Sequence, residues 1–433
     1  MNCDYLRRSK SERREFLKFS AAVLVAADID SANQLGNSTP RESELQDIRL
    51  LPPQPPQQLH AYENLTKWKL ADCIALIRAD LARERFGIDG SGLTVAVLDT
   101  GLNTTHVDFA GKDRIPATMN FTSNDQNDVT DSNGHGTHLG GIIVANGLHK
   151  GVAPCARIVP VKVTNSTDFG WLSVVCKGLE YVQKHHDQYG ISVVNISYEG
   201  EESYTADDHK SQVFQKVRGL IRELRDEDVA TVISAGNRFY PFSKEGMSIP
   251  AIARESISVG AVYSISDGYQ PPVYGAWARK TAPDQITPYT KRLHASTPTA
   301  ECCTDLFAPG GTVQSTGIQN NVGFDTGQGT SQAAAFVSGV VLLVQHYIRK
   351  TTGQLPSVED IEQWLVAGSV DIQDAPSDPP IDNVVHTNKT FRRVDALGAL
   401  EAAQSYLVHA GFQKQKLPGK CFRGRGRKAR KPR

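Results

Sequence analysis

Short apolar runs alternate with longer amphipathic segments through the middle of the chain. The runs are rich in β-branched residues, are apolar on both faces and cover residues 93–99, 157–164, 191–197, 229–236 and 256–262. This pattern is typical of parallel strands that are covered on both sides. The amphipathic segments between them, near residues 135–146, 171–188 and 209–226, predict helices. The alternation predicts an α/β fold in which helices flank a mostly parallel central sheet.

Further segments with helical spacing lie before and after this region. A long apolar segment follows Ser331, two amphipathic segments lie near residues 357–367 and 394–406, and residues 68–86 have helical spacing. No apolar run reaches the ~18 residues that a membrane-spanning helix needs, so we expect no transmembrane segment. With 39% hydrophobic residues, the chain can bury a substantial core.

The N-terminal 30 residues have the pattern of a targeting segment. Arg13 and Arg14 directly precede a short apolar stretch, which is similar to a bacterial twin-arginine export signal. Asp28 and Asp30 interrupt the region where a small-residue cleavage site would lie. We therefore expect an exported protein, periplasmic or secreted, and keep a basic amphipathic helix in a cytoplasmic protein as the alternative.

Composition divides the rest of the chain into three parts. Residues 31–65 are rich in Pro and Gln and predict a disordered or polyproline linker; residues 66–411 carry the folded pattern. Residues 412–433 hold ten Lys or Arg and no acid, which leaves 37 basic against 47 acidic residues elsewhere. We interpret this end as a basic, disordered tail, and contact with an acidic surface or nucleic acid is the alternative.

Seven cysteines occur at irregular positions, and no Cys-x-x-Cys pair is present. This spacing argues against a zinc ribbon or a thioredoxin-like site. Cys302 and Cys303 are adjacent, and adjacent cysteines seldom bridge each other. Neither the disulfide pairing nor the redox compartment follows from the count.

Two motifs contain an ionisable side chain at the end of a predicted strand or the start of a predicted helix. Asp99 closes the strand over residues 93–99, and ligands of open α/β sheets bind beyond the carboxyl ends of the strands. His135 begins a helix in the sequence Asn-Gly-His-Gly-Thr-His, whose small residues leave the imidazole room to reach another loop. Taken alone, Asp99 could be a turn residue and His135 a capping residue. His138 could be the functional histidine or a core residue.

Two further motifs concern a nucleophile and an anion site. Ser331 lies where a Gly-rich loop becomes the long apolar helix, so its hydroxyl is exposed near the free N–H groups of a first helical turn. Asn237 ends the sequence Ser-Ala-Gly-Asn beyond another strand and could donate a hydrogen bond to an oxyanion. Taken alone, Ser331 could be a helix cap and Asn237 a turn residue.

Together the four motifs resemble those of the subtilases, the subtilisin-like serine proteases of peptidase family S8. The order Asp, His, Ser is the one that this family uses. VAVLDTG, HGTH, SAGN and GTSQAA are similar to its landmark motifs, and the resemblance spans about residues 85–408. It implies a three-layer subtilisin-like fold over residues 66–411 and a serine endopeptidase.

The resemblance also implies roles for single residues. Asp99, His135 and Ser331 would form the catalytic triad, and Asn237 with the Ser331 N–H would form the oxyanion hole. The substrate would be an extended protein or peptide segment, bound along Ser197, Tyr198, Glu199 and Gly200, with Ala235 and Gly236 walling the first pocket. No cofactor is required for this chemistry, and structural calcium is possible without an assignable site. A peptide transferase or cyclase, and an inactive binding protein, are the alternatives.

Three departures from the family pattern modify these expectations. Gln332 stands where Met is usual, and residues 263–304 read as a surface insertion near the substrate side. Glu199 stands beside the first specificity pocket, where Gly is common. A carboxylate at the rim of that pocket predicts a basic residue just before the cut, most strongly at low salt. A solvated acidic loop that points away is the alternative.

Overall fold

The computed structural model describes residues 47–58, 69–165 and 170–411. The export-like segment, most of the predicted linker and the basic tail lie outside the described residues. The described residues up to Ala403 belong to one compact unit, which contains the central sheet and every predicted site residue.

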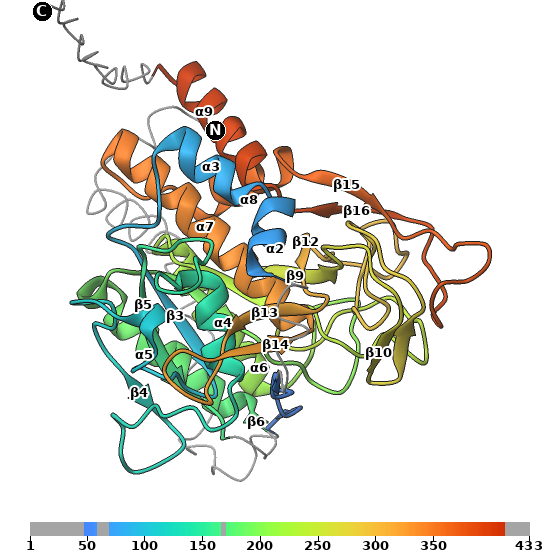
Figure 1. Cartoon of the computed structure of the whole chain (residues 1–433), viewed down its shortest axis with the longest axis horizontal. Helices are drawn as coiled ribbons and strands as arrows, with labels where there is room; N and C mark the ends of the chain where they lie inside the picture. The colour runs from blue at the N-terminus through green and yellow to red at the C-terminus, as the bar shows by residue number, and fades with distance from the viewer. Residues whose placement is uncertain (1–46, 59–68, 166–169, 412–433) are drawn as a thin grey trace, which may run out of the picture. The chain divides into compact units, whose positions relative to one another are not determined.

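Within the described residues, the central sheet has nine strands. Figure 1 shows it between the flanking helices. Their order is β15 (Val370–Gln373), β16 (Thr390–Arg393), β12 (Leu306–Pro309), β9 (Ile257–Val262), β8 (Ala230–Ser234), β7 (Ile191–Ile196), β3 (Thr94–Asp99), β5 (Arg157–Lys162) and β4 (Met119–Asn120). All neighbouring pairs are parallel except β15 with β16. The predicted parallel sheet is confirmed, and β12, β15, β16 and β4 are strands that the apolar pattern missed.

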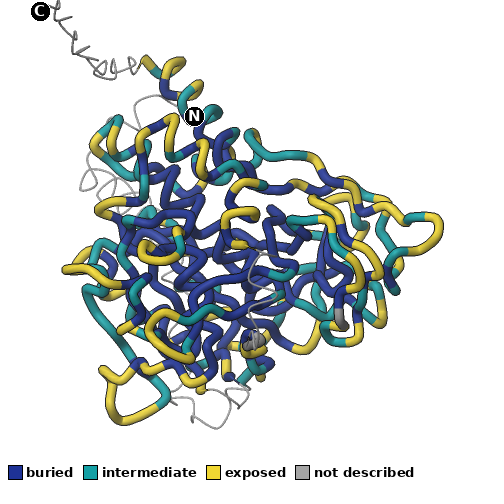
Figure 2. The backbone as a smooth tube through the Cα atoms, in the orientation of Figure 1, coloured by how far each residue is buried: buried dark blue, intermediate teal, exposed yellow. Residues whose placement is uncertain are grey.

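Helices cover both faces of this sheet. In β7, Val194 and Ile196 pack into a cluster with α5 (Leu172–Tyr189) and α6 (Gln212–Asp226). The side chain between them, Asn195, instead bonds Ser338 on α7 (Thr330–Thr352), at 3.0 Å. Because successive strand residues point to opposite faces, α7 and the α5–α6 pair lie on opposite sides. Figure 2 shows the middle of the sheet and most of α7 in the buried colour.

Helix α7 is the core helix of the fold. It is long and apolar enough to cross a membrane by length and composition, but 89% of its most apolar window is buried inside the protein. It packs on β7, β8 and β9 and on α4 (His135–Val144). Its apolar character is therefore explained by burial in the protein core.

The remaining helices largely follow the predicted spacing. They are α2 (Leu70–Leu76), α3 (Ala79–Phe86), α8 (Val358–Ala367), α9 (Ala396–His409) and a 3-10 turn, η4 (Val107–Phe109). The single helical segment predicted over residues 68–86 is two helices. Arg78 separates them with a left-handed φ of 51°, which a continuous helix cannot accommodate.

Residues 47–58 belong to the same compact unit as the central sheet. They contain β1 (Arg49–Leu50), which pairs with β6 (Gly170–Trp171), and β2 (Gln57–Gln58), which joins a small sheet with β14 (Phe324–Gly327) and β13 (Val313–Thr316). The disordered or polyproline linker over residues 31–65 stays a prediction, and β1 and β2 lie within that range. The prolines between β1 and β2 interrupt the strand pairing but do not prevent it, because the paired residues lie on either side of them.

The long insertion folds partly as a hairpin. β10 (Gln270–Val273) and β11 (Ala276–Ala278) pair antiparallel around Tyr274, whose φ of 48° is left-handed. Figure 1 shows β10 at the edge of the fold.

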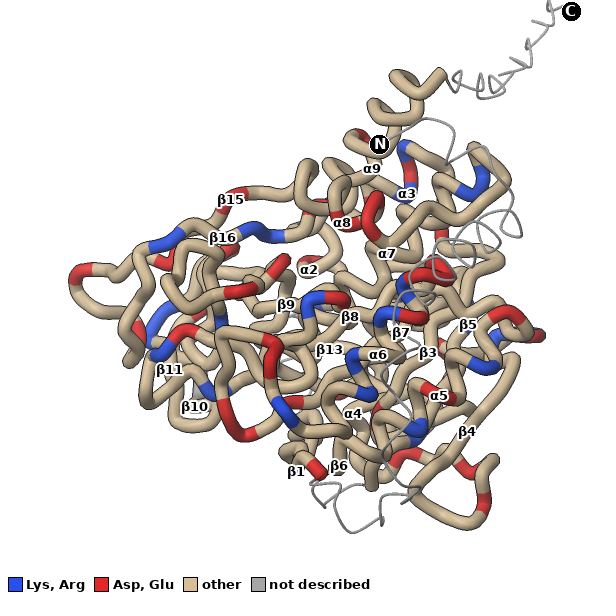
Figure 3. Tube along the Cα trace, turned by 180° about the vertical axis from the view of Figure 1, so that it is seen from behind, with Lys and Arg blue, Asp and Glu red and all other residues tan. Residues whose placement is uncertain are grey.

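Some charged side chains form ion pairs inside the fold. Figure 3 shows basic and acidic segments interspersed on the face seen from behind. The acidic loop after β7 is one example: Asp207 is buried and binds Arg254 at 2.6 Å and Arg218 at 2.9 Å. This part of the loop is therefore structural and not a solvated acidic face. The five cysteines in the described residues are free thiols, Cys302 and Cys303 included.

Candidate active site

The carboxyl ends of three neighbouring strands meet where α7 begins. The sheet order β8-β7-β3 brings Ala235, Ser197 and Asp99 to one edge, because each follows or ends its strand. Parallel strands present their carboxyl ends on the same side, so residues that are far apart in the sequence become neighbours. The polar residues singled out in the sequence therefore converge at this edge.

Asp99 and His135 form a buried pair. The Asp99 Oδ1 atom lies 2.8 Å from His135 Nδ1 and also accepts the Thr100 N–H at 2.8 Å. Asp99 is fully buried and His135 is 3% exposed. A carboxylate bound to Nδ1 fixes the tautomer in which Nε2 is free to accept a proton.

The start of α4 is built to hold this imidazole. The Asp131 carboxylate accepts hydrogen bonds from the backbone N–H groups of Asn133, Gly134 and Thr137, so it caps the first turn. Gly136 lies so close to the Asp99 strand that an added Cβ would stand 2.3 Å from the Gly101 carbonyl oxygen. Asp131 was missed from the sequence, since an Asp four residues before a His carries no catalytic signal.

His138 is a buried core residue, and the histidine that contacts Asp99 is His135. His138 is fully buried, and its Nε2 lies 3.1 Å from the Val313 carbonyl oxygen. Burial lowers its pKa to about 3, so it stays neutral. The three-residue spacing puts both histidines on one side of α4, about one turn apart. Their neighbours separate their roles, because His135 contacts Asp99 and His138 contacts the Val313 carbonyl.

Ser331 lies in the first turn of α7, as its sequence predicts, and is 7% exposed. Its backbone carbonyl accepts a 3.3 Å hydrogen bond from Ser197 Oγ, which in turn accepts one from Asn195 Nδ2 at 3.0 Å. Ser331 and His135 line the same pocket, although within the described residues no hydrogen bond joins their side chains. Catalytic hydrogen bonds are often long before substrate binds.

The Asn237 side chain is oriented by Thr330. Its Oδ1 accepts the Thr330 backbone N–H at 2.8 Å and the Thr330 hydroxyl at 3.0 Å. These two donors identify the side-chain oxygen of Asn237. The Nδ2 group therefore points away from Thr330. Asn237 lines the same pocket as Ser331. Thr330 is a positioning residue whose role no sequence motif indicated.

The expected substrate-binding residues surround this site. Ser197, Tyr198 and Glu199 line the pocket, while Ala235 is buried behind it. Gly236 adopts a φ of 112°, which favours Gly. Glu199 is 5% exposed, so it lies inside the protein and not at a solvent-exposed rim. The preference for a basic residue before the cut stays a prediction.

The N-terminal strand occupies the edge where a substrate strand was expected. Arg49 and Leu50 pair antiparallel with Trp171 and Gly170, and Leu50 also forms a bridge to Gly200 on its other side. The Leu51 N–H donates to the Glu199 carbonyl oxygen at 2.9 Å. Residues 49–51 are therefore held between two segments of the cleft.

The prolines after this strand line the same pocket as His135 and Ser331. Pro52, Pro53 and Gln54 line a pocket of about 30 Å³ together with His135 and Ser331. The Pro53 carbonyl accepts a 3.3 Å hydrogen bond from the Asn133 side chain. Beyond them, residues 57–58 pair with Asp325 and Thr326 of β14, so the segment spans the cleft from one side to the other.

Comparison with known proteins agrees with this arrangement. The sequence profile described as the subtilase family matches residues 90–389, which is more than half of the chain. The chain belongs to the subtilase family. Its mostly parallel sheet between helices is the fold expected of that family.

Several named relatives are similar to this subtilase. Subtilisin-like protease 3 of Saccharomyces cerevisiae is 31% identical over 66% of this chain and 50% of its own length. Subtilisin-like protease 1 of Pseudogymnoascus destructans is 32% identical over 59% and 52%. Alkaline serine exoprotease A of Vibrio alginolyticus is 28% identical over 64% and 42%. The chain thus spans about half the length of the curated relatives it matches.

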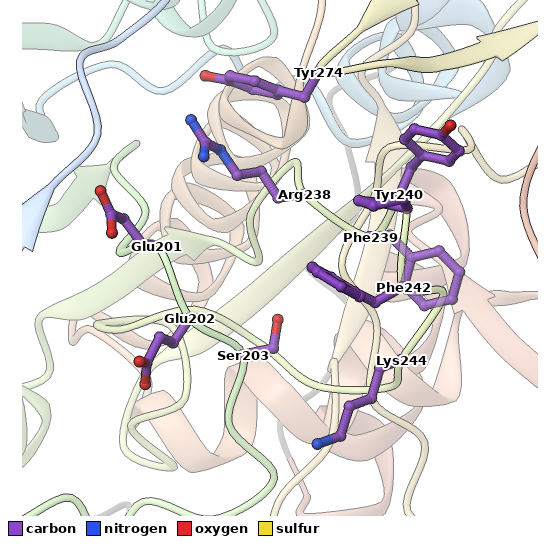
Figure 4. A pocket seen from close by; sticks show the side chains of 10 residues that line it. Glu201, Glu202, Ser203, Arg238, Phe239, Tyr240, Phe242, Lys244 and Tyr274 are labelled. Carbon is purple, nitrogen blue, oxygen red and sulfur yellow. The ribbon is translucent and has the colours of Figure 1, made fainter.

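A second pocket lies beside the active site of this subtilase. It has a volume of about 580 Å³ and is lined by Glu201, Glu202, Ser203, Arg238, Phe239, Tyr240, Pro241, Phe242, Lys244 and Tyr274. Figure 4 shows Arg238 extending toward Tyr274, and its guanidinium lies 4.6 Å from the centre of that ring. Tyr274 lines both pockets, so the inserted hairpin reaches the substrate side.

Metal ligands do not gather in the described part of this subtilase. No group of three or more His, Cys, Asp or Glu side chains there could hold a metal ion. The possibility of structural calcium therefore stays a prediction without a site.

Proposed function

We propose that this subtilase is a serine endopeptidase that hydrolyses peptide bonds through Asp99, His135 and Ser331. The observation that carries the proposal is the buried 2.8 Å contact between Asp99 Oδ1 and His135 Nδ1, with Ser331 on the same pocket. Asn237 would supply one oxyanion donor and the Ser331 N–H the other. Family membership supports the reaction class.

The mechanism is derived from the position of each group. His135 Nε2 accepts the proton of the Ser331 hydroxyl as Oγ attacks the scissile carbonyl carbon. Asp99 stabilises the imidazolium that forms. The carbonyl oxygen becomes an oxyanion beside the Asn237 amide and the first turn of α7, where free N–H groups favour negative charge. His135 then protonates the leaving amine, and water repeats the sequence on the acyl-enzyme.

The substrate is an extended polypeptide in this proposal. The segment 49–51 uses the same edge that a substrate strand would use, because its backbone pairs with Gly170, Glu199 and Gly200. Recognition through main-chain hydrogen bonds is the way that exposed sheet edges bind peptides. This form of the protein is therefore a blocked one, and residues 47–58 must leave the cleft before a substrate strand can bind.

A peptide-cleavage assay tests the reaction. The purified full-length protein and Ser331→Ala are incubated with an unstructured protein substrate, and the products are identified by mass spectrometry. The proposal expects internal cuts with the wild type only, with water added at each cut. Equal cleavage by both proteins, or joined peptides without hydrolysis, would overturn it.

Export is a separate part of the proposal. It rests on Arg13 and Arg14 before an apolar stretch, and these residues lie outside the described structure. Fractionation of the source cells, with Arg13 and Arg14 replaced by Lys, tests it. Accumulation of the wild type in the cytoplasm would contradict it.

A further inference from the structure

A buried ion pair lies behind the Asn237 turn. Glu199 Oε2 is 4.0 Å from Lys291 Nζ, and the two residues are 5% and 0% exposed. Burial raises the pKa of Glu199 and lowers the pKa of Lys291 to about 8. Taking both charges out of water is costly, so such a pair is weak evidence of a stabilising role alone.

Glu199 and Lys291 bind the two polar groups of the peptide bond between Gly236 and Asn237. The Asn237 backbone N–H donates to Glu199 Oε2 at 2.7 Å, and the Lys291 backbone N–H donates to the Gly236 carbonyl at 2.8 Å. Lys291 Nζ also donates to the Glu202 carbonyl and to Ser248 Oγ, each at 2.8 Å. The turn that carries Asn237 is thereby tied to three other segments.

There is little room for this turn to shift. A Cβ at Gly236 would stand 2.4 Å from Ser248 Oγ, 2.8 Å from Glu199 Oε2 and 2.8 Å from Lys291 Cδ. The Gly236 N–H donates to Thr330 Oγ1 at 3.1 Å, which joins the turn to the start of α7. A small displacement of a positioned group can cost a large factor in rate.

Glu199 also contacts the strand in the cleft. Its carbonyl oxygen accepts the Leu51 N–H at 2.9 Å, while its carboxylate accepts the Asn237 N–H. One residue therefore links the binding edge to the turn beside Ser331. None of the catalytic motifs required this link, since the family pattern has Gly at this position.

We propose that Glu199 and Lys291 are positioning residues that hold the Asn237 amide where it can donate to the oxyanion. The proposal rests on the proposed endopeptidase function. Glu199 acts through its contact with the Asn237 N–H. Lys291 lies 4.0 Å from that carboxylate and binds the Gly236 carbonyl through its backbone N–H. Neither side chain takes part in a proton transfer.

A double-mutant cycle tests the proposal in the full-length protein. Turnover of two fluorogenic peptides, with Lys or Leu before the cut, is measured for wild type, Glu199→Ala, Asn237→Ala and the double variant. Rates are normalised to the sites that a fluorophosphonate labels after prolonged reaction, which corrects for blocked clefts. Asp208→Ala serves as the matched control, because its side chain is exposed on the same loop.

The expected result is specific to action through Asn237. Glu199→Ala lowers kcat roughly 10- to 100-fold with little change in KM for both peptides. The loss disappears in the Asn237→Ala background, because the donor that Glu199 positions is gone. Glu199→Gln retains most of kcat, since a carboxamide oxygen still accepts the Asn237 N–H. Asp208→Ala stays near wild type.

Three outcomes would overturn the proposal. The first is an equal loss from Glu199→Ala with and without Asn237, and the second is an unchanged kcat in a folded Glu199→Ala protein. The third is a loss confined to the Lys peptide, which would make Glu199 a specificity residue instead. Failure of the proposed function itself has a different signature, since then no peptide is cleaved and Ser331→Ala changes nothing.

Discussion

The Leu51 N–H donates to the Glu199 carbonyl oxygen at 2.9 Å, so the N-terminal strand uses a main-chain acceptor of the cleft itself. A substrate strand and this strand cannot hold the same acceptor together. We therefore expect a chain that starts at Gln58 to cleave peptides at least several-fold faster than the full-length protein. A synthetic peptide of residues 47–58 should inhibit it, and the same peptide with Leu50→Asp should not, because Leu50 is fully buried. Equal rates for the two chains would contradict the blocked form.

We expect the prolines after Leu51 to protect the segment from cleavage. Pro52 and Pro53 have no N–H, so the strand cannot continue its ladder toward Ser331. Replacing both with Ala should let the backbone stay in register and be cut in the full-length protein. Intact-mass measurements should find a cut within residues 51–55. The exposed Pro55→Ala should remain uncut, as should the double variant that also carries Ser331→Ala. An uncut Pro52→Ala, Pro53→Ala protein with a reactive Ser331 would argue against this explanation.

Close packing at Gly136 makes the His135 helix sensitive to a single methyl group. An Ala at position 136 would bring Cβ within 2.3 Å of the Gly101 carbonyl and 3.2 Å of Asp99 Cβ. We expect Gly136→Ala to reduce kcat more than tenfold and to destabilise the protein by roughly 1–3 kcal/mol. Gly219→Ala is the control, because nothing lies within 4 Å of its added Cβ on α6. Replacing that helical Gly should leave activity unchanged and raise stability by up to about 1 kcal/mol. Chemical denaturation and peptide turnover measure both effects.

Stability should decline at mildly alkaline pH because of His386. This imidazole binds Asp374 at 2.8 Å and Asp382 at 3.2 Å, and these hydrogen bonds raise its pKa to about 9. Since the folded pKa lies above the unfolded value, the stabilisation is fully present below about pH 6.5 and is lost as the pH rises through 9. His386→Gln should flatten the fall in unfolding free energy between pH 6 and 9, by on the order of 2 kcal/mol. His185→Gln, whose ring bonds Gln188, should keep the wild-type slope. An unchanged slope in His386→Gln would refute this assignment.

The parts of the fold that the sequence predicted are those with a strong local signal. The apolar runs ending at Asp99 and Ile196 and the helix after Ser331 need only periodicity, because their faces are buried. The short strands β12 and β16 were not predicted, because four residues give too little pattern to distinguish a strand from a loop.

The site residues divide in the same way. Asp99, His135, Asn237 and Ser331 each stand at a strand or helix end, so the sheet topology brings them together once the order of strands is known. Asp131, Thr330 and Lys291 make contacts with residues 6, 93 and 92 positions away, which no catalytic motif indicates. The strand pairing of the Pro-rich segment could not be predicted for another reason. Its composition is that of a linker, whereas its pairing depends on an edge that exists only in the folded protein.

The site of reaction with a fluorophosphonate decides whether Ser331 is the nucleophile. The full-length protein and the chain starting at Gln58 are treated with the probe, digested and analysed by mass spectrometry. We predict one stoichiometric adduct on Ser331, formed faster in the shorter chain. It should be absent from Ser331→Ala and slowed by orders of magnitude in His135→Ala. An adduct on another residue, or no adduct in a folded protein of either length, would contradict the assignment of Ser331 as the nucleophile.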